Sequence, residues 1–185
     1  LYHELQLYSL HGQSKDALSK NRAGAWEYDV MYPAYKCNMT NINAAIGIAQ
    51  LDRYDGLLKR RRELNENYRN ALEKLGLKVM HHYTDEMTST GHLYLVRIPG
   101  ASVEDRNAVI QDMAERGIAC NVHYKPLPMM TAYKNLGFDI KDYPNAYHQY
   151  ENLISLPVFS TMTDEQNAYV IENFADILKK RGLIK

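Results

Sequence analysis

A single apolar stripe at helical spacing constrains the fold of this chain more than any other feature. Between Asn41 and Gly76 apolar residues recur at intervals of three and four, which predicts one long helix with one buried face. The stripe consists of Ile42, Ala45, Ile46, Ala49, Leu57, Leu58, Leu64, Tyr68 and Leu72. A helix of about 35 residues exceeds the roughly 8–20 residues usual in one domain. We therefore expect Gly56 to kink or divide it, and we expect the helix to link two bodies.

Shorter predicted elements lie on both sides of this helix. Ahead of it we expect a helix over 1–10, a polar loop to residue 25 and an extended aromatic segment over 26–35. After it the apolar patterns predict strands over 77–80, 93–98 and 118–122, and helices over 102–116, 131–136, 144–153 and from 163 onward. Ser102 with Asp105 and Thr163 with Gln166 have the spacing of capping boxes. These elements predict an α/β fold with a small mixed or antiparallel sheet.

Composition argues against several functional classes. Among the 185 residues, Lys plus Arg number 22 and Asp plus Glu number 22, so no net field directs the chain to nucleic acid or to an acidic membrane. No apolar run approaches the roughly 18 residues that a membrane span needs. Cys37 and Cys120 stand outside any metal-binding spacing, so we expect two reduced core thiols in a cytoplasmic protein. His81 and His82 should point to opposite faces of a strand, so no metal site is expected.

Two polar segments are candidates for ligand binding. His123 and Tyr124 directly follow the predicted strand 118–122, and ligands commonly bind at strand ends in α/β units. Tyr35-Lys36-Cys37-Asn38 stands just ahead of the long helix, where the helix dipole and free backbone amides favour a phosphate. Each segment also has a purely structural alternative. The histidine could be bonded to backbone in a turn, and the second segment could simply cap the helix.

A long string at the start of the helix resembles a family signature. Residues 34–51, AYKCNMTNINAAIGIAQL, resemble the "GYNYRMSDLQAAIGLAQL" string of the DegT/StrS sugar aminotransferases. Other landmarks follow in the family's order: His11-Gly12, Arg60-Arg61-Arg62 with Tyr68, Gly117-Ile118, His123-Tyr124, Tyr133, Leu136-Gly137, Pro144 and Ser155-Leu156-Pro157. The resemblance thus extends from about Leu5 to Ile177, which is nearly the whole chain.

The resemblance implies a fold-type I pyridoxal-phosphate (PLP) transferase, usually a homodimer, that moves an amino group from glutamate to a keto sugar attached to a nucleotide. It implies that residues 1–40 are the remnant of the large PLP-binding domain and interface arm, 41–76 the linking helix and 77–185 the small C-terminal α/β domain. The family's Schiff-base lysine lies in a "K…GEGG" segment ahead of the His-Gly landmark, and this chain contains no such segment. The chain also opens without a methionine inside a predicted helix. We therefore expect that lysine upstream of Leu1 and no catalytic residue within the chain.

Site residues follow from the same resemblance. It assigns Lys36 and Asn38 to the cofactor phosphate. It assigns the nucleotide sugar to His123, Tyr124, Tyr35 and His11. The family's glycine and arginine in the signature are Ala34 and Asn38 here, and the second histidine of its "HYPPLH" string is Met129 or Met130.

Two alternatives stay open at this stage. One is a sugar dehydratase of the same family, in which histidine replaces the Schiff-base lysine. The other is a non-catalytic domain that binds a nucleotide sugar or regulates a full-length partner.

Overall fold

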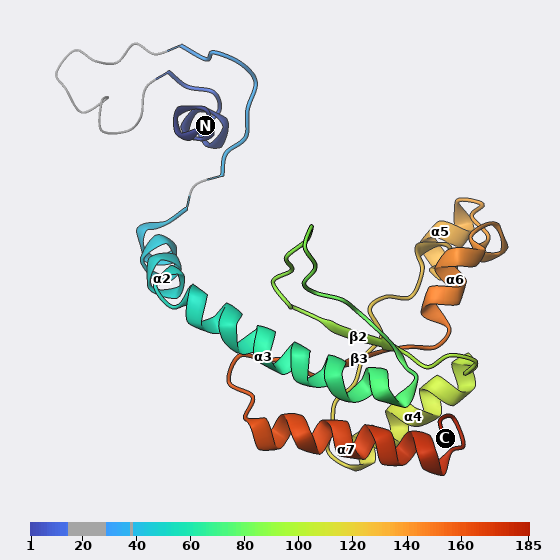
Figure 1. Ribbon diagram of the computed structural model, residues 1–185. Helices are drawn as coiled ribbons and strands as arrows, with labels where there is room; N and C mark the ends of the chain where they lie inside the picture. Colours follow the sequence, from blue (N-terminus) through green and yellow to red (C-terminus); the bar gives the residue numbers. More distant parts are fainter. Residues whose placement is uncertain (15–28, 38) are drawn as a thin grey trace. The chain divides into compact units, whose positions relative to one another are not determined.

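The computed structural model describes residues 1–14, 29–37 and 39–185 (Figure 1). It divides into two compact units, Leu1–Arg53 and Tyr54–Lys185. Most of the predicted polar loop, Trp26 and Asn38 lie outside the described residues.

The first unit contains two helices, and short antiparallel backbone pairings lie in the segments between them. Helix α1 spans Tyr2–Ser9 and helix α2 spans Asn41–Leu51. Antiparallel bridges join Leu10 to Lys36 and Gln13 to Val30. Gly12 has φ +72°, and a Cβ at this position would lie 2.0 Å from the carbonyl oxygen of Tyr32, so this close approach requires glycine.

The long predicted helix is two helices. Helix α2 ends at Leu51, and helix α3 begins at Tyr54 and runs to Leu72, so the break falls at residues 52–53. Gly56 lies inside α3, and its prediction as the dividing residue is wrong. The short helix η2 (Glu73–Leu75) follows, and Gly76 ends it with left-handed backbone at φ 77°, the conformation typical of a glycine at a helix C-terminus.

A three-stranded antiparallel sheet forms the centre of the second unit. Its strands are β1 (Lys78–Val79), β2 (Tyr94–Arg97) and β3 (Leu153–Leu156), in the order β1-β2-β3. The register pairs Lys78 with Arg97 and Val96 with Ile154. This confirms the predicted α/β class with a small sheet.

Two parts of the predicted sheet are wrong. Residues 118–122 form no strand, because the amide of Ile118 closes helix α4 by donating to Met113 O at 3.0 Å, and only Asn121 bridges to Ser155. Strand β3 is absent from the predicted strands, and only its first residue, Leu153, falls within the predicted helix 144–153. All four of its residues are buried, so the sequence shows no polar alternation that would mark a strand.

Helices cover one face of this sheet. Helices α3, α4 (Val103–Glu115) and α7 (Asp164–Lys180) pack together, and Figure 1 shows α7 alongside α3. Tyr94 and Val96 of β2 point into this core, whereas Leu95 and Arg97 alternate to the other face. The principal core residues are Leu64, Tyr68, Leu72, Tyr94, Val96, Ile98, Val109, Met113, Ile154, Val170, Phe174, Ile177 and Leu178.

Both predicted capping boxes are confirmed. The hydroxyl of Ser102 accepts from Asp105 N at 3.1 Å, and the Asp105 carboxylate accepts from Ser102 N at 3.0 Å. Thr163 and Gln166 make the same reciprocal pair at 3.2 and 3.0 Å. The sequence therefore placed the starts of α4 and α7 correctly.

A helical excursion leaves the sheet between β2 and β3. It comprises η3 (Leu127–Met129), α5 (Thr131–Asn135), η4 (Ile140–Asp142) and α6 (Pro144–Tyr150). Two arginines attach its last part to the body. Arg97 donates to His148 O at 2.5 Å and to Asn152 Oδ1 at 2.9 Å. Arg106, buried, donates to Tyr150 O at 3.3 Å, and its guanidinium lies over the Tyr150 ring.

Helix length and hydropathy also bear on membrane insertion. None of the helices in the described part of the chain is both long enough and apolar enough to cross a membrane.

Candidate functional site

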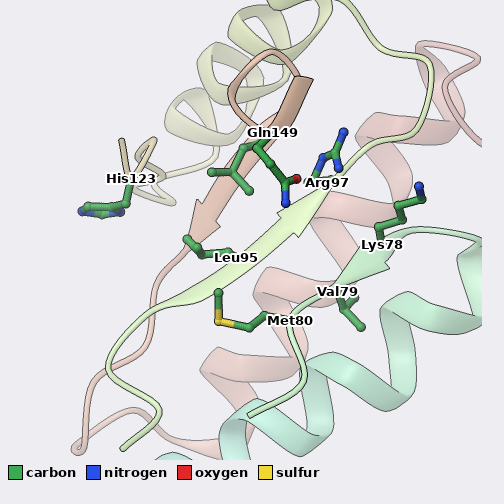
Figure 2. A pocket seen from close by; sticks show the side chains of 8 residues that line it. Lys78, Val79, Met80, Leu95, Arg97, His123 and Gln149 are labelled. Atoms are coloured by element: carbon green, nitrogen blue, oxygen red, sulfur yellow. The ribbon is translucent and has the colours of Figure 1, made fainter. Parts of the chain in front are cut away.

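The face of the sheet opposite the helices forms an open cavity of about 430 Å³ (Figure 2). Alternation along β2 directs Leu95 and Arg97 to this face, and the register places Lys78 beside Arg97. The cavity is lined by Lys78, Val79, Met80, Leu95, Arg97, His123, Gln149 and Leu153. The sheet supplies an apolar floor, and the polar groups stand around it.

The charged groups of this cavity are all cationic. Lys78 contributes an ammonium group and Arg97 a guanidinium group, and no carboxylate is among the lining residues. Arg97 donates hydrogen bonds to His148 O and Asn152 Oδ1, which leaves part of its guanidinium free for a ligand. Lys78 makes no ion pair with any residue the structure describes. Such a set of donors suits a ligand that carries negative charge and acceptor oxygens.

His123, predicted as a substrate residue, lines this cavity. Its Nδ1 lies 2.8 Å from the hydroxyl of Ser155, whose side chain is buried. Figure 2 shows the imidazole on the opposite side of the cavity from Lys78. Tyr124 packs edge-on against the His123 ring at 4.7 Å but is 72% exposed and lies outside the lining.

A second group of predicted site residues lies in the first unit. The amide of His11 donates to Tyr35 O at 2.8 Å, and the amide of Cys37 donates to Ser9 O at 2.9 Å. These bonds hold the backbone on both sides of Lys36, and the side chain of Lys36 is exposed. Cys37 is exposed too, so its prediction as a core thiol is wrong. The structure thus brings His11, Tyr35 and Lys36 together, and Asn38 lies outside the described residues.

Sequence reasoning missed four polar residues of the cavity region: Lys78, Arg97, Gln149 and Ser155. A signal existed for Arg97, because it is the one charge within the apolar run 93–98 and falls on the face opposite Tyr94 and Val96. Ser155 was noted only as part of a motif, since nothing local in the sequence connects it to His123. Gln149 belongs to α6 and reaches the cavity only through the long excursion.

The two adjacent histidines form no common site. His82 is buried, whereas His81 is exposed and lies 3.5 Å from a Glu73 carboxylate oxygen. Across the described residues, no group of three or more His, Cys, Asp or Glu side chains is placed to hold a metal ion.

A small antiparallel sheet, backed by helices on one face and carrying a cationic cavity on the other, defines an α/β domain with a candidate anion site. The chain belongs to the DegT/DnrJ/EryC1/StrS aminotransferase family, whose model matches residues 1–175. This confirms the resemblance found in the sequence.

Solved and curated relatives agree with this assignment. Spr1654 from Streptococcus pneumoniae, described as a candidate sugar aminotransferase and solved in its PMP form, is 51% identical with a TM-score of 0.85 over 97% of this chain and 45% of that chain. The spore coat polysaccharide biosynthesis protein SpsC of Bacillus subtilis is 32% identical over 95% of this chain and 46% of its own length. The chain therefore spans less than half the length of these relatives.

Proposed function

We propose that this chain is the C-terminal part of a PLP-dependent aminotransferase that transfers an amino group from glutamate to a nucleotide-linked keto sugar. The observation that carries this proposal is the similarity to Spr1654, which has been solved in both a PLP form and a PMP form. Those two forms are the aldehyde and amine states of the cofactor, between which a transaminase alternates. At 51% identity over 97% of this chain, a shared reaction is the simplest expectation.

The first unit fits a role at the cofactor phosphate. Lys36 is exposed, its backbone is held by the bridge to Leu10, and it has no ion pair with a residue that the structure describes. Such an ammonium group suits a phosphate, and Asn38 two residues later adds an amide donor. Lys36 and Asn38 would therefore hold the phosphate of PLP, while the cofactor when bound supplies the electron sink for the chemistry.

The second unit fits a role toward the nucleotide sugar. His123 presents an imidazole at the cavity rim, and Lys78 and Arg97 supply positive charge. These groups would bind and orient the acceptor-rich substrate, with Tyr124 as a further contact. In the first unit, Tyr35 and His11 are the residues that we propose for substrate contacts. The amine that bonds the cofactor covalently would come from a part of the protein outside this chain, so the chain alone would be inactive.

The exposed apolar face of α2 supports assembly into a homodimer. Ile42 and Ile46, four residues apart on one face, are 74% and 58% exposed, and no residue of α2 is buried. Helices with such faces normally pack against another body. We propose that residues 77–185 form the small C-terminal domain, 1–40 belong to the cofactor-binding domain, and α2 and α3 connect them in a cytoplasmic enzyme.

Substitutions in a chimaera test these assignments. The chain replaces the matching part of Spr1654, and the chimaera is assayed for PLP retention and for transamination of nucleotide-linked keto sugars, with unaltered Spr1654 assayed beside it. A lost charge-assisted hydrogen bond is worth about 1.5–3 kcal/mol, so Asn38→Ala should weaken PLP retention roughly ten- to a hundredfold. His123→Ala should raise KM for the sugar nucleotide and leave PLP affinity nearly unchanged.

Each variant serves as the control for the other. If Asn38→Ala held PLP as tightly as the parent chimaera, or if His123→Ala lost PLP, the residues would be assigned to the wrong ligand.

A further inference from the structure

Ser155 is a buried hydroxyl with one side-chain partner. It is 4% exposed, and within the described part of the chain its Oγ is bonded only to His123 Nδ1, at 2.8 Å. Two backbone bonds fix the geometry of this pair, since Ser155 N donates to Asn121 O at 2.7 Å and Asn121 N donates to Ser155 O at 3.1 Å. The segment that carries His123 is thereby fastened to β3.

The direction of the Ser155–His123 bond follows from the inventory of protons. A serine hydroxyl carries one proton, and a buried donor without an acceptor is unfavourable. The only side-chain acceptor bonded to this hydroxyl is His123 Nδ1, so the hydroxyl donates and Nδ1 carries no proton in the neutral ring. The proton of the neutral imidazole then resides on Nε2, which is the nitrogen left for a ligand.

We propose that Ser155 is a positioning residue that holds His123 as a hydrogen-bond donor, so that the cavity takes the anionic, acceptor-rich phosphoryl part of a ligand. Lys78 and Arg97 are also donors that cannot accept, and no carboxylate lines the cavity. His123 in this state gives a hydrogen bond to a ligand oxygen and does not withdraw a proton from it. Only the naming of the ligand as a sugar nucleotide rests on the proposed function.

The same geometry excludes a nucleophilic serine. Ser155 is buried and meets the ring at Nδ1 from within the sheet. Its hydroxyl has no access to a substrate, so Ser155 contributes by fixing the orientation and the tautomer of the His123 ring.

Nuclear magnetic resonance on the full 185-residue chain tests the proposal. With ¹⁵N-labelled histidine, at a pH about two units above the ordinary histidine value of roughly 6.5, long-range ¹⁵N–¹H spectra report which ring nitrogen is protonated. We expect His123 to be a single tautomer protonated at Nε2. Inorganic pyrophosphate should shift this signal saturably.

Two variants separate positioning from mere packing. Ser155→Ala should allow a measurable population protonated at Nδ1 and weaken the pyrophosphate response at least several-fold. Ser155→Thr keeps the hydroxyl and should restore both, with folding of each variant verified by circular dichroism.

Protonation at Nδ1 in the wild-type chain, absence of a pyrophosphate response, or a Ser155→Ala spectrum identical to wild type would each overturn the proposal. Because these readouts do not depend on transamination, their failure would leave the proposed function standing, and failure of the chimaera would leave the tautomer result standing.

Discussion

His82 illustrates at the scale of a single residue how burial controls charge. The side chain is 4% exposed, its Nδ1 lies 3.1 Å from Ser89 Oγ, and its Nε2 has no partner in the described structure. Burial lowers the pKa of this imidazole, and the nearby Glu66 carboxylate opposes the shift only partly. The rings of Tyr83 and Tyr94 also pack beside it, and burial raises the pKa of the Tyr94 phenol, so Tyr94 supplies no negative charge near neutral pH.

A pH dependence of stability follows from the lowered pKa of His82. The folded state binds fewer protons than the unfolded state, so the free energy of unfolding should fall as pH drops below the ordinary histidine value of about 6.5. Urea unfolding at about pH 7.5 and about pH 5 measures this loss. The variant His82→Gln should show a smaller difference between the two pH values. An unchanged difference would assign the pH dependence to other groups.

The two cysteines should differ sharply in reactivity. Cys37 is exposed, whereas burial raises the pKa of the Cys120 thiol to about 12. Since the thiolate is the reactive form, iodoacetamide should modify Cys37 and spare Cys120 in the native chain. Mass spectrometry of tryptic peptides reads out both sites, and Cys37→Ser should be almost unlabelled until denaturant is added. Rapid native labelling of Cys120 would contradict the described core.

Helix capping is the clearest test at the scale of elements. The Thr163 hydroxyl accepts from Gln166 N at 3.2 Å at the start of α7, whose buried stripe fills the core. Thr163→Ala should lower the free energy of unfolding by about 0.5–2 kcal/mol, because an amide at the helix start loses its acceptor. Thr163→Ser should retain most of the stability in the same denaturant titration. Equal stability of the alanine and serine variants would show that the cap contributes nothing.

Elements with strong local signals could be predicted, and elements set by long-range contacts could not. The capping boxes and the α7 stripe of Val170, Phe174, Ile177 and Leu178 lie within a few residues of one another in sequence, so pattern alone located them. Strand β3 has both faces buried, and its identity depends on pairing with β2 far away in the sequence. Residues 118–122 have strand-like composition, but the first amide of this segment, that of Ile118, donates its hydrogen bond to a carbonyl at the end of α4 and not to a neighbouring strand.

At the scale of the whole molecule, the two halves of the long apolar stripe differ in burial. In α3, Leu64, Tyr68 and Leu72 are fully buried inside the second unit. In α2, Ile42 and Ile46 are exposed within the first unit. The apolar spacing is the same in both helices. An amphipathic pattern predicts that one helix face is buried, but it does not predict which part of the molecule buries it.

The candidate site, like the fold, could be predicted only in part from the sequence. His123 was located from its position after an apolar run, and the structure places it at a cavity. Its partner Ser155 and the cationic residues Lys78 and Arg97 came to light only when the register of the sheet was known. A polar residue at a turn can be recognised as a site candidate from the sequence alone. Residues that meet across neighbouring strands can be recognised only when the strand pairing is known.

The half-reaction of the Spr1654 chimaera with glutamate tests the central claim most directly. It requires no knowledge of the sugar, because glutamate alone should convert bound PLP to PMP, which is followed by the change in cofactor absorbance. Unaltered Spr1654 is the positive control and the isolated chain the negative control. We predict conversion in the chimaera and none in the isolated chain. A chimaera that folds and retains PLP yet fails to convert it with glutamate, or an isolated chain that converts it alone, would contradict the account.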